Sequence, residues 1–245
     1  MSAAPPQEMR LHGANAVRAL FRQRPQALRK LYLSQAQAHA WGDVMQWCAR
    51  HRIGYRLVED ADLQRLAGTS HHEGVVADVL RAPELPLSAW LRDLPDGPAC
   101  ALWLDGVGNP HNLGAILRSA AHFGAAILLP KGSPLALSGA AARVAEGGAE
   151  AVPLVRMGRS DNTFAQLRGA GFALWGTRVE GGADLFAVPL PARVVYVLGA
   201  EQSGIDRDLL ALCDAQVSIP GSGAVESLNV SAAAAVLLAA WSMRR

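Results

Sequence analysis

The sequence predicts a two-domain α/β protein whose larger, carboxyl-terminal domain is built on a largely parallel sheet. After Ala99, short apolar runs alternate with longer amphipathic stretches, the pattern of buried strands separated by helices. A proline-rich stretch at residues 82–98 separates this region from a shorter α/β pattern at residues 8–81. The chain has 245 residues, 51% of them hydrophobic, which is enough to form a core in each part.

The amino-terminal domain, residues 8–81, is expected to alternate helices and strands. Apolar residues at 16, 17, 19, 20 and 21 with arginines among them predict a basic amphipathic helix over residues 15–24, which Pro25 ends. The remaining elements are helices at 35–50 and 60–66 and strands at 31–33, 55–58 and 74–80. Residues 82–98 contain four prolines and are predicted to be a linker that supplies no core.

The carboxyl-terminal domain, residues 99–245, carries six apolar runs that predict strands. They lie at residues 101–104, 126–129, 152–155, 172–175, 194–198 and 216–219. Parallel sheets are covered by helices on both faces, and their ligands bind beyond the carboxyl ends of the strands. Three unusual loops follow such ends, so we expect them to carry the function.

Composition excludes several classes of protein. No apolar run reaches the roughly 18 residues of a membrane span, and the longest covers residues 232–241. The amino terminus lacks the basic flank and apolar stretch of a secretory signal, so we expect a cytoplasmic protein without a membrane partner. Cys48, Cys100 and Cys213 are widely spaced and odd in number, which argues against a disulfide framework and against a metal site.

Positive charge is concentrated in the amino-terminal domain. Residues 1–81 hold eleven basic and seven acidic side chains, whereas residues 99–245 hold eleven of each. From Arg10 to Lys30 the arginines run without an intervening acid, which suits a phosphate-rich partner. The candidate contacts to such a partner are Arg18, Arg22, Arg24 and Arg29. The alternative is a solvated helix face without a partner.

The first two loops fail as nucleotide-binding fingerprints. In the first, counting from Gly106 puts His111 where a dinucleotide fingerprint needs its third glycine. Asn112 is a good helix N-cap there, and Arg118 follows on the same helix, where it could simply form a surface ion pair. The second loop, residues 199–205, has the glycine spacing of a phosphate loop without its lysine.

The glycines of the second loop instead allow close backbone approach around Glu201, although a simple tight turn has the same pattern. The third loop, residues 219–231, leads into an alanine-rich helix that Ser227 could cap. A nicotinamide or nucleotide enzyme is therefore the weaker alternative.

Taken together, the three loops resemble the signature motifs of the SpoU/TrmH-type RNA 2′-O-ribose methyltransferases of the knotted SPOUT superfamily. The motifs are Asn-Leu-Gly-Ala-Ile-Leu-Arg at 112–118, Gly-Ala-Glu-Gln-Ser-Gly at 199–204 and Ser-Leu-Asn-Val-Ser at 227–231. The amino-terminal domain resembles the substrate-binding domain of the 23S rRNA guanosine-2′-O-methyltransferase type, in Leu-His-Gly-Ala-Asn-Ala-Val at 11–17 and His-Glu-Gly-Val-Val-Ala at 72–77. Glu73 and Asn109 depart from the usual glutamine and aspartate.

The resemblance implies properties that periodicity does not give. It implies a deep trefoil knot in the carboxyl-terminal domain, a homodimer, and S-adenosylmethionine as cofactor without a metal. The positions implied to hold the cofactor are Thr177, Leu198, Gly199, Gly204, Ile219 and Leu228. The implied reaction is methyl transfer to a ribose 2′-hydroxyl in structured RNA, with rRNA favoured and tRNA second.

The resemblance also implies a catalytic group, made up of Asn112, Arg118, Glu201, Ser227 and Asn229. A guanidinium is a poor base, so we expect Arg118 to hold the phosphate beside the reacting ribose. Glu201 either orders the surrounding hydrogen bonds or takes up the proton. The competing interpretation is an RNA-binding protein that retains the fold and has lost catalysis.

Overall fold

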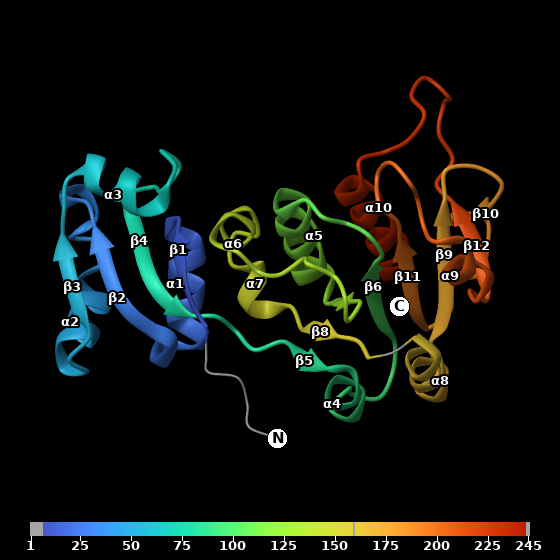
Figure 1. Cartoon of the computed structure of the whole chain (residues 1–245), viewed down its shortest axis with the longest axis horizontal. Helices are drawn as coiled ribbons and strands as arrows, with labels where there is room; N and C mark the ends of the chain where they lie inside the picture. The colour runs from blue at the N-terminus through green and yellow to red at the C-terminus, as the bar shows by residue number, and fades with distance from the viewer. Residues whose placement is uncertain (1–6, 159, 244–245) are drawn as a thin grey trace. The chain divides into compact units, whose positions relative to one another are not determined.

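The computed structural model describes residues 7–158 and 160–243 and divides them into two compact units (Figure 1). The amino-terminal unit comprises the chain up to Pro83 together with Leu137–Ala151. The carboxyl-terminal unit comprises Glu84–Ala136 and the chain from Val152 onward.

The amino-terminal unit contains a four-stranded sheet in the order β1-β4-β2-β3. β4 is antiparallel to β1 and β2, whereas β2 and β3 are parallel. The strands are β1 (Glu8–His12), β2 (Leu28–Leu33), β3 (Gly54–Leu57) and β4 (Val75–Leu80). The three predicted strands are confirmed. β1 was not predicted, because only two of its five residues are buried and its pattern is correspondingly weak.

The helices of this part of the chain follow the predicted order with shifted boundaries. They are α1 (Ala14–Gln23), α2 (Gly42–Arg50) and α3 (Asp60–Ala67), with 3-10 turns η1 (Pro25–Ala27) and η2 (Gln35–Gln37). The helix expected over 35–50 is wrong in its first turns. There Gln37 donates to the Glu73 carbonyl and Trp41 is buried, so tertiary contacts replace a continuous helix.

Two short helices from the middle of the chain, α6 (Gly139–Val144) and α7 (Gly148–Ala151), pack with the amino-terminal unit. Gly139 approaches β1 so closely that a Cβ would overlap the Arg10 carbonyl oxygen. Arg24 donates to both carboxylate oxygens of Glu150, at 2.7 and 2.9 Å. The sequence grouped residues 137–151 with the carboxyl-terminal domain, but their contacts group them with the amino-terminal unit.

The carboxyl-terminal unit contains an eight-stranded, wholly parallel sheet in the order β10-β12-β9-β11-β6-β7-β8-β5. All six predicted strands are present. Their observed bounds are β6 (Ala99–Leu104), β7 (Ala126–Leu129), β8 (Leu154–Arg156), β9 (Ala173–Arg178), β11 (Arg193–Leu198) and β12 (Ala215–Ser218). The two edge strands, β5 (Leu85–Pro86) and β10 (Ala183–Asp184), are too short to have a pattern in the sequence.

The proline-rich stretch 82–98 does supply core, contrary to expectation. It forms β5 and the helix α4 (Leu87–Arg92), whose Leu87 and Trp90 are buried. The Trp90 ring lies 5.5 Å from that of Phe172 in the same hydrophobic cluster. Pro86 precedes the helix at its N-cap and so does not interrupt it.

Helices cover the sheet and place the loops at its carboxyl edge. They are α5 (Pro110–Phe123), α8 (Ser160–Gly169), α9 (Arg207–Ala211) and α10 (Val230–Ser242). α10 packs on α5 and reaches β11 and β6, the middle of the sheet. Within the described residues, no helix is long and apolar enough to cross a membrane.

Candidate functional site

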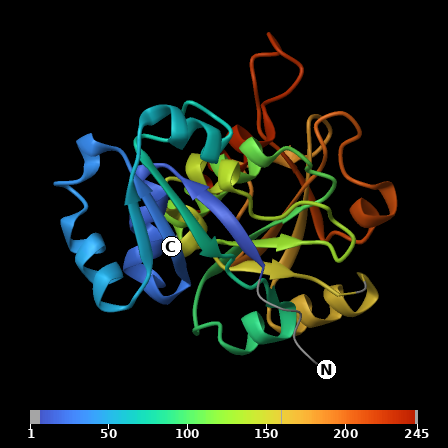
Figure 2. The same cartoon turned by 60° about the vertical axis from the view of Figure 1, so that its left-hand side comes forward.

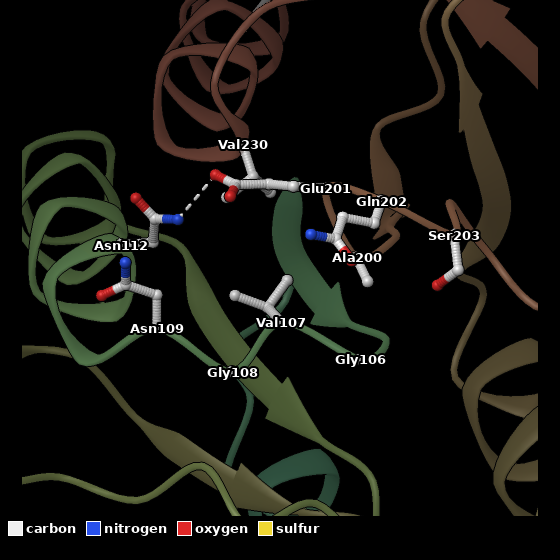
Figure 3. Close-up of a pocket in the computed structure, with 10 residues that line it drawn as sticks. All are labelled: Gly106, Val107, Gly108, Asn109, Asn112, Ala200, Glu201, Gln202, Ser203 and Val230. Carbon is white, nitrogen blue, oxygen red and sulfur yellow. Dashed lines mark hydrogen bonds between the residues drawn. The ribbon is translucent and has the colours of Figure 1, made fainter.

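The three loops singled out in the sequence meet at one cleft. β6 and β11 are neighbouring parallel strands, paired through Leu104 and Leu198, so the loops that follow them start side by side. The amino end of α10 completes the cleft, whose volume is about 310 Å³ (Figure 3). It is lined by Gly106, Val107, Gly108, Asn109, Asn112, Ala200, Glu201, Gln202, Ser203 and Val230.

Asn112, Glu201 and Asn229, one from each loop, form a hydrogen-bonded group that we call the polar cluster. Asn112 Nδ2 donates to Glu201 Oε1 at 2.8 Å, and Asn229 Nδ2 donates to the same oxygen at 2.9 Å. Asn229 Nδ2 also lies 3.2 Å from Asn112 Oδ1, which accepts. Glu201 Oε2 accepts no hydrogen bond from any residue the structure describes. One carboxylate oxygen is therefore held, and the other is available.

Helix capping leaves the side-chain amide nitrogens of Asn112 and Asn229 available for the polar cluster. The prediction that Asn112 caps its helix is wrong, because Asn109 is the N-cap of α5 and accepts from the His111 backbone N–H at 2.9 Å. Similarly Asn229, and not Ser227, caps α10. Asn229 Oδ1 accepts from the Ser231 N–H while its Nδ2 donates into the polar cluster. Each cap thus fixes a helix whose first turn faces the cleft.

Two glycines shape the loop that presents Glu201. Ala200 and Gly204 exchange backbone hydrogen bonds of 3.1 and 2.9 Å, closing a tight turn. A Cβ at Gly199 would overlap the Gly204 carbonyl, and Gly204 itself adopts φ +69°, which favours glycine. These glycines are needed for the turn itself, and the turn holds Glu201 beside Asn112.

The residues implied to hold the cofactor lie along the ends of three adjacent strands, outside the lining of the cleft. β12, β9 and β11 are neighbours, with Val217 opposite Thr177 and Val197 opposite Gly176. Thr177 Oγ1 donates to the Val197 carbonyl at 2.8 Å, Leu198 is buried, and Ile219 directly follows β12.

This edge offers backbone groups beyond the strand ends and the buried side chain of Leu198, which fit the adenine and polar groups of S-adenosylmethionine, and the sulfonium of that cofactor activates its methyl group without a metal. Leu228 stands apart, because it is 47% exposed on the loop 219–229, which extends away from the sheet in both views (Figures 1 and 2).

Arg118 and Ser227 are not part of the polar cluster. Both are exposed, neither lines the cleft, and neither forms a hydrogen bond or ion pair with another residue in the described part of the chain. Arg118 lies on α5, about 9 Å along the helix axis from Asn112 at ~1.5 Å per residue. It is an exposed cation on the helix that carries Asn112, without an ion pair to any described residue, and its catalytic role stays a prediction.

The four predicted RNA-binding arginines divide into two pairs. Arg18 donates to both oxygens of Asp43 at 2.8 and 2.9 Å, lies 4.1 Å from the Trp41 ring centroid, and lowers the pKa of the Asp43 carboxyl. Arg24 is bound to Glu150. Arg22 and Arg29 are exposed, without an ion pair to any described residue. Only the second pair has a guanidinium free for phosphate.

Of the ten lining residues, the sequence had singled out only Asn112 and Glu201 as site residues; three of the other eight have polar side chains, Asn109, Gln202 and Ser203. Their signal was their position inside the two loops, next to residues that were predicted. Across residues 7–158 and 160–243, no group of three or more His, Cys, Asp or Glu side chains could hold a metal ion.

The fold and the cleft are those of a two-unit α/β protein, and matches to two families assign it to the RNA methyltransferase class. Residues 99–239 match the SpoU rRNA Methylase family, and residues 10–84 match the RNA 2′-O ribose methyltransferase substrate binding domain. The chain belongs to the SpoU rRNA Methylase family. The sequence-based fold class is thereby confirmed, with the trefoil knot resting on the resemblance to the family.

Curated relatives agree with this assignment, and a solved structure shares the fold. The chain is 37% identical to the Escherichia coli O157:H7 "Uncharacterized tRNA/rRNA methyltransferase YfiF", over 96% of this chain and 68% of that one. It is 36% identical to the Nitrosomonas europaea 23S rRNA (guanosine-2'-O-)-methyltransferase RlmB, over 93% and 88%. The SpoU methyltransferase AviRb from Streptomyces viridochromogenes, solved in complex with AdoMet, shares the fold with a TM-score of 0.78 at 23% identity, over 97% and 90% of the two chains.

Proposed function

We propose that the protein transfers a methyl group from S-adenosylmethionine to a ribose 2′-hydroxyl in structured RNA, with rRNA favoured over tRNA. The observation that carries the proposal is the polar cluster, which joins all three family motifs at one cleft. The RlmB relatives act on 23S rRNA, and the AviRb structure contains the cofactor. An RNA-binding protein that had lost catalysis would have no need to keep this cluster.

The cofactor is proposed to bind along the ends of β9, β11 and β12. Thr177, Leu198, Gly199 and Ile219 would contact it there, with Gly204 and Leu228 as further contacts from the flanking loops. S-adenosylmethionine supplies an electrophilic methyl group on a sulfonium. The protein therefore has to align a weak oxygen nucleophile and accept its proton.

Arg118 and Glu201 divide this work in our proposal. Arg118, unpaired and exposed, would grip the phosphate next to the target ribose through two parallel hydrogen bonds. Glu201 would accept the hydroxyl proton at Oε2, since Asn112 and Asn229 already occupy Oε1. Ser227, exposed just before the α10 cap, would contact the RNA as it enters the cleft.

We assign RNA affinity to residues 8–81 and chemistry to residues 99–245, the division that the charge distribution predicted. Because Leu137–Ala151 pack with the amino-terminal unit, cutting the chain between residues 82 and 98 would not separate the two compact units. We further propose a homodimer, on the family resemblance, and a cytoplasmic location, which fits an RNA substrate and three cysteines that form no disulfide bond among the described residues.

The test is to delete the gene and map 2′-O-methylation across all RNAs of the strain. Loss of methylation at one or a few riboses, restored by the wild-type gene and not by an Arg118→Ala gene, supports the proposal. Calorimetry on the purified protein should detect S-adenosylmethionine but neither NAD nor ATP. An unchanged methylation map, or binding of NAD in place of S-adenosylmethionine, refutes it.

A further inference from the structure

Five arginines of the amino-terminal unit are exposed and form no ion pair with any residue that the structure describes. They contrast with Arg10, Arg18 and Arg24, each of which is bound to a carboxylate of the same unit. The unpaired five are Arg22, Arg29, Arg50, Arg52 and Arg56. An unpaired exposed guanidinium can contact phosphate without first breaking an ion pair.

Four of these arginines converge at one end of the sheet. Arg22 and Arg50 are in the last turns of α1 and α2. The chain then enters the parallel neighbours β2 and β3, near whose starts Arg29 and Arg52 lie. This is the lower end of β2 and β3 in Figure 1. Lys30 lies opposite Gly54 in the register, which places Arg29 beside the entry to β3.

An aromatic stack lies at the same end. The Phe21 ring of α1 meets the Trp47 ring of α2 edge-on, with centroids 5.5 Å apart. Trp47 in turn stacks on His51, with centroids 4.1 Å apart and an interplanar angle of 20°. His51 Nδ1 donates to the Trp47 carbonyl at 2.9 Å, which fixes the ring. His51 is exposed and Trp47 partly so. We call this set, Arg22, Arg29, Trp47, Arg50, His51 and Arg52, the basic–aromatic surface.

Carboxylates are absent from the sequence around this surface. Residues 44–58 contain no aspartate or glutamate, and Asp43 just before them is bound to Arg18. Favourable interaction with the helix dipole accounts for basic residues at helix carboxyl ends, as for Arg22 and Arg50. The helix dipole does not account for Arg29, which lies at the register shift between Leu28 and Lys30, or for Arg52, which lies in a loop. It also does not account for the stacking of His51 on Trp47 at the same end of the sheet.

We propose that the basic–aromatic surface binds an unpaired segment of the RNA, with the arginines on successive phosphates and a base stacked on His51. Proteins that bind single-stranded nucleic acid combine cationic side chains along its backbone with aromatic rings on which its bases stack. A duplex keeps its bases stacked on one another and offers none to the ring. The inference rests on the proposed RNA substrate, and it moves the contact away from Arg18 and Arg24.

The experiment measures binding of a fluorescently labelled, unstructured oligoribonucleotide by anisotropy across a salt series, with the full-length protein at pH 8. Arg50→Gln/Arg52→Gln should lower the slope of log affinity against log salt by about 1.4, at ~0.7 for each lost single-strand phosphate contact. His51→Ala should weaken binding roughly tenfold with little change in slope, as expected for one stacked base. His51→Tyr should restore it. The matched control is Arg65→Gln, an exposed arginine on α3 that is paired with Asp62.

Each outcome decides the question. If the wild type binds the oligoribonucleotide and the double variant keeps its slope, the basic–aromatic surface is refuted and the proposed function stands. If Arg65→Gln lowers the slope as much as the double variant does, the effect is general charge and the surface is equally refuted. If duplex RNA of the same sequence binds as well as the single strand, stacking on His51 is refuted. If the wild type binds S-adenosylmethionine but no RNA, the proposed function itself is refuted, and with it the basic–aromatic surface.

Discussion

Replacing Glu201 separates a structural role of this carboxylate from a chemical one. Glu201→Ala removes the acceptor of two hydrogen bonds, from Asn112 and Asn229, of 2.8 and 2.9 Å. The Asn112 side chain is buried, so its amide would lose its partner away from water. A hydrogen bond to a charged group contributes about 1.5–3 kcal/mol, and because Glu201 is exposed to solvent we expect its two hydrogen bonds together to contribute less than twice the lower value, about 2 kcal/mol.

Glu201→Gln keeps an oxygen where Oε1 stands and removes the proton acceptor. In a chain of this size about 1 kcal/mol shifts Tm by roughly 2–4 °C. The alanine variant should therefore melt about 4–8 °C lower, and the glutamine variant close to wild type. Both should lose methyl transfer by about 10²–10⁴, the usual contribution of a general base.

The assays for this pair are scanning calorimetry and single-turnover transfer of labelled methyl to RNA from a strain that lacks the gene. A glutamine variant as active as wild type would refute proton transfer to Glu201. An alanine variant with unchanged Tm would refute the structural role of the polar cluster.

Three further predictions follow from the geometry. Arg118→Ala should abolish methyl transfer and leave S-adenosylmethionine affinity nearly intact, measured by calorimetry; near-normal turnover would remove it from the mechanism. Arg24→Ala should destabilise the protein by about 2 kcal/mol in urea unfolding, because the Glu150 side chain is only 6% exposed and would lose its partner; no change would contradict this. Burial, and then the charge of Arg143, lower the pKa of His12 in the folded state. Stability should then fall as pH drops below the unfolded value of about 6.5, by up to ~1.4 kcal/mol per unit, and less steeply in His12→Gln; parallel curves would disprove it.

Much of the fold followed from local patterning. The runs that became β6, β7 and β11 are apolar enough to identify as buried strands, because a strand covered on both faces must be hydrophobic along its whole length. The general rule that ligands lie beyond strand ends predicted that the three loops would carry the function. The motif residues Asn112, Glu201 and Asn229 needed no structure to be singled out.

Only the tertiary structure decided which side chains are already engaged. In sequence, Arg22 and Arg24 are equivalent members of one basic run, but Glu150, some 126 residues away, binds one of them and leaves the other free. In the same way Asn112 has the sequence of a cap and is freed from capping by Asn109. The sequence by itself determined the elements, the motifs and the family, since these depend on residue type and spacing along the chain. The partners of Arg24, the use of residues 85–92 as core and the hydrogen bonds of Glu201 depend on contacts between distant segments, which form only when the chain has folded.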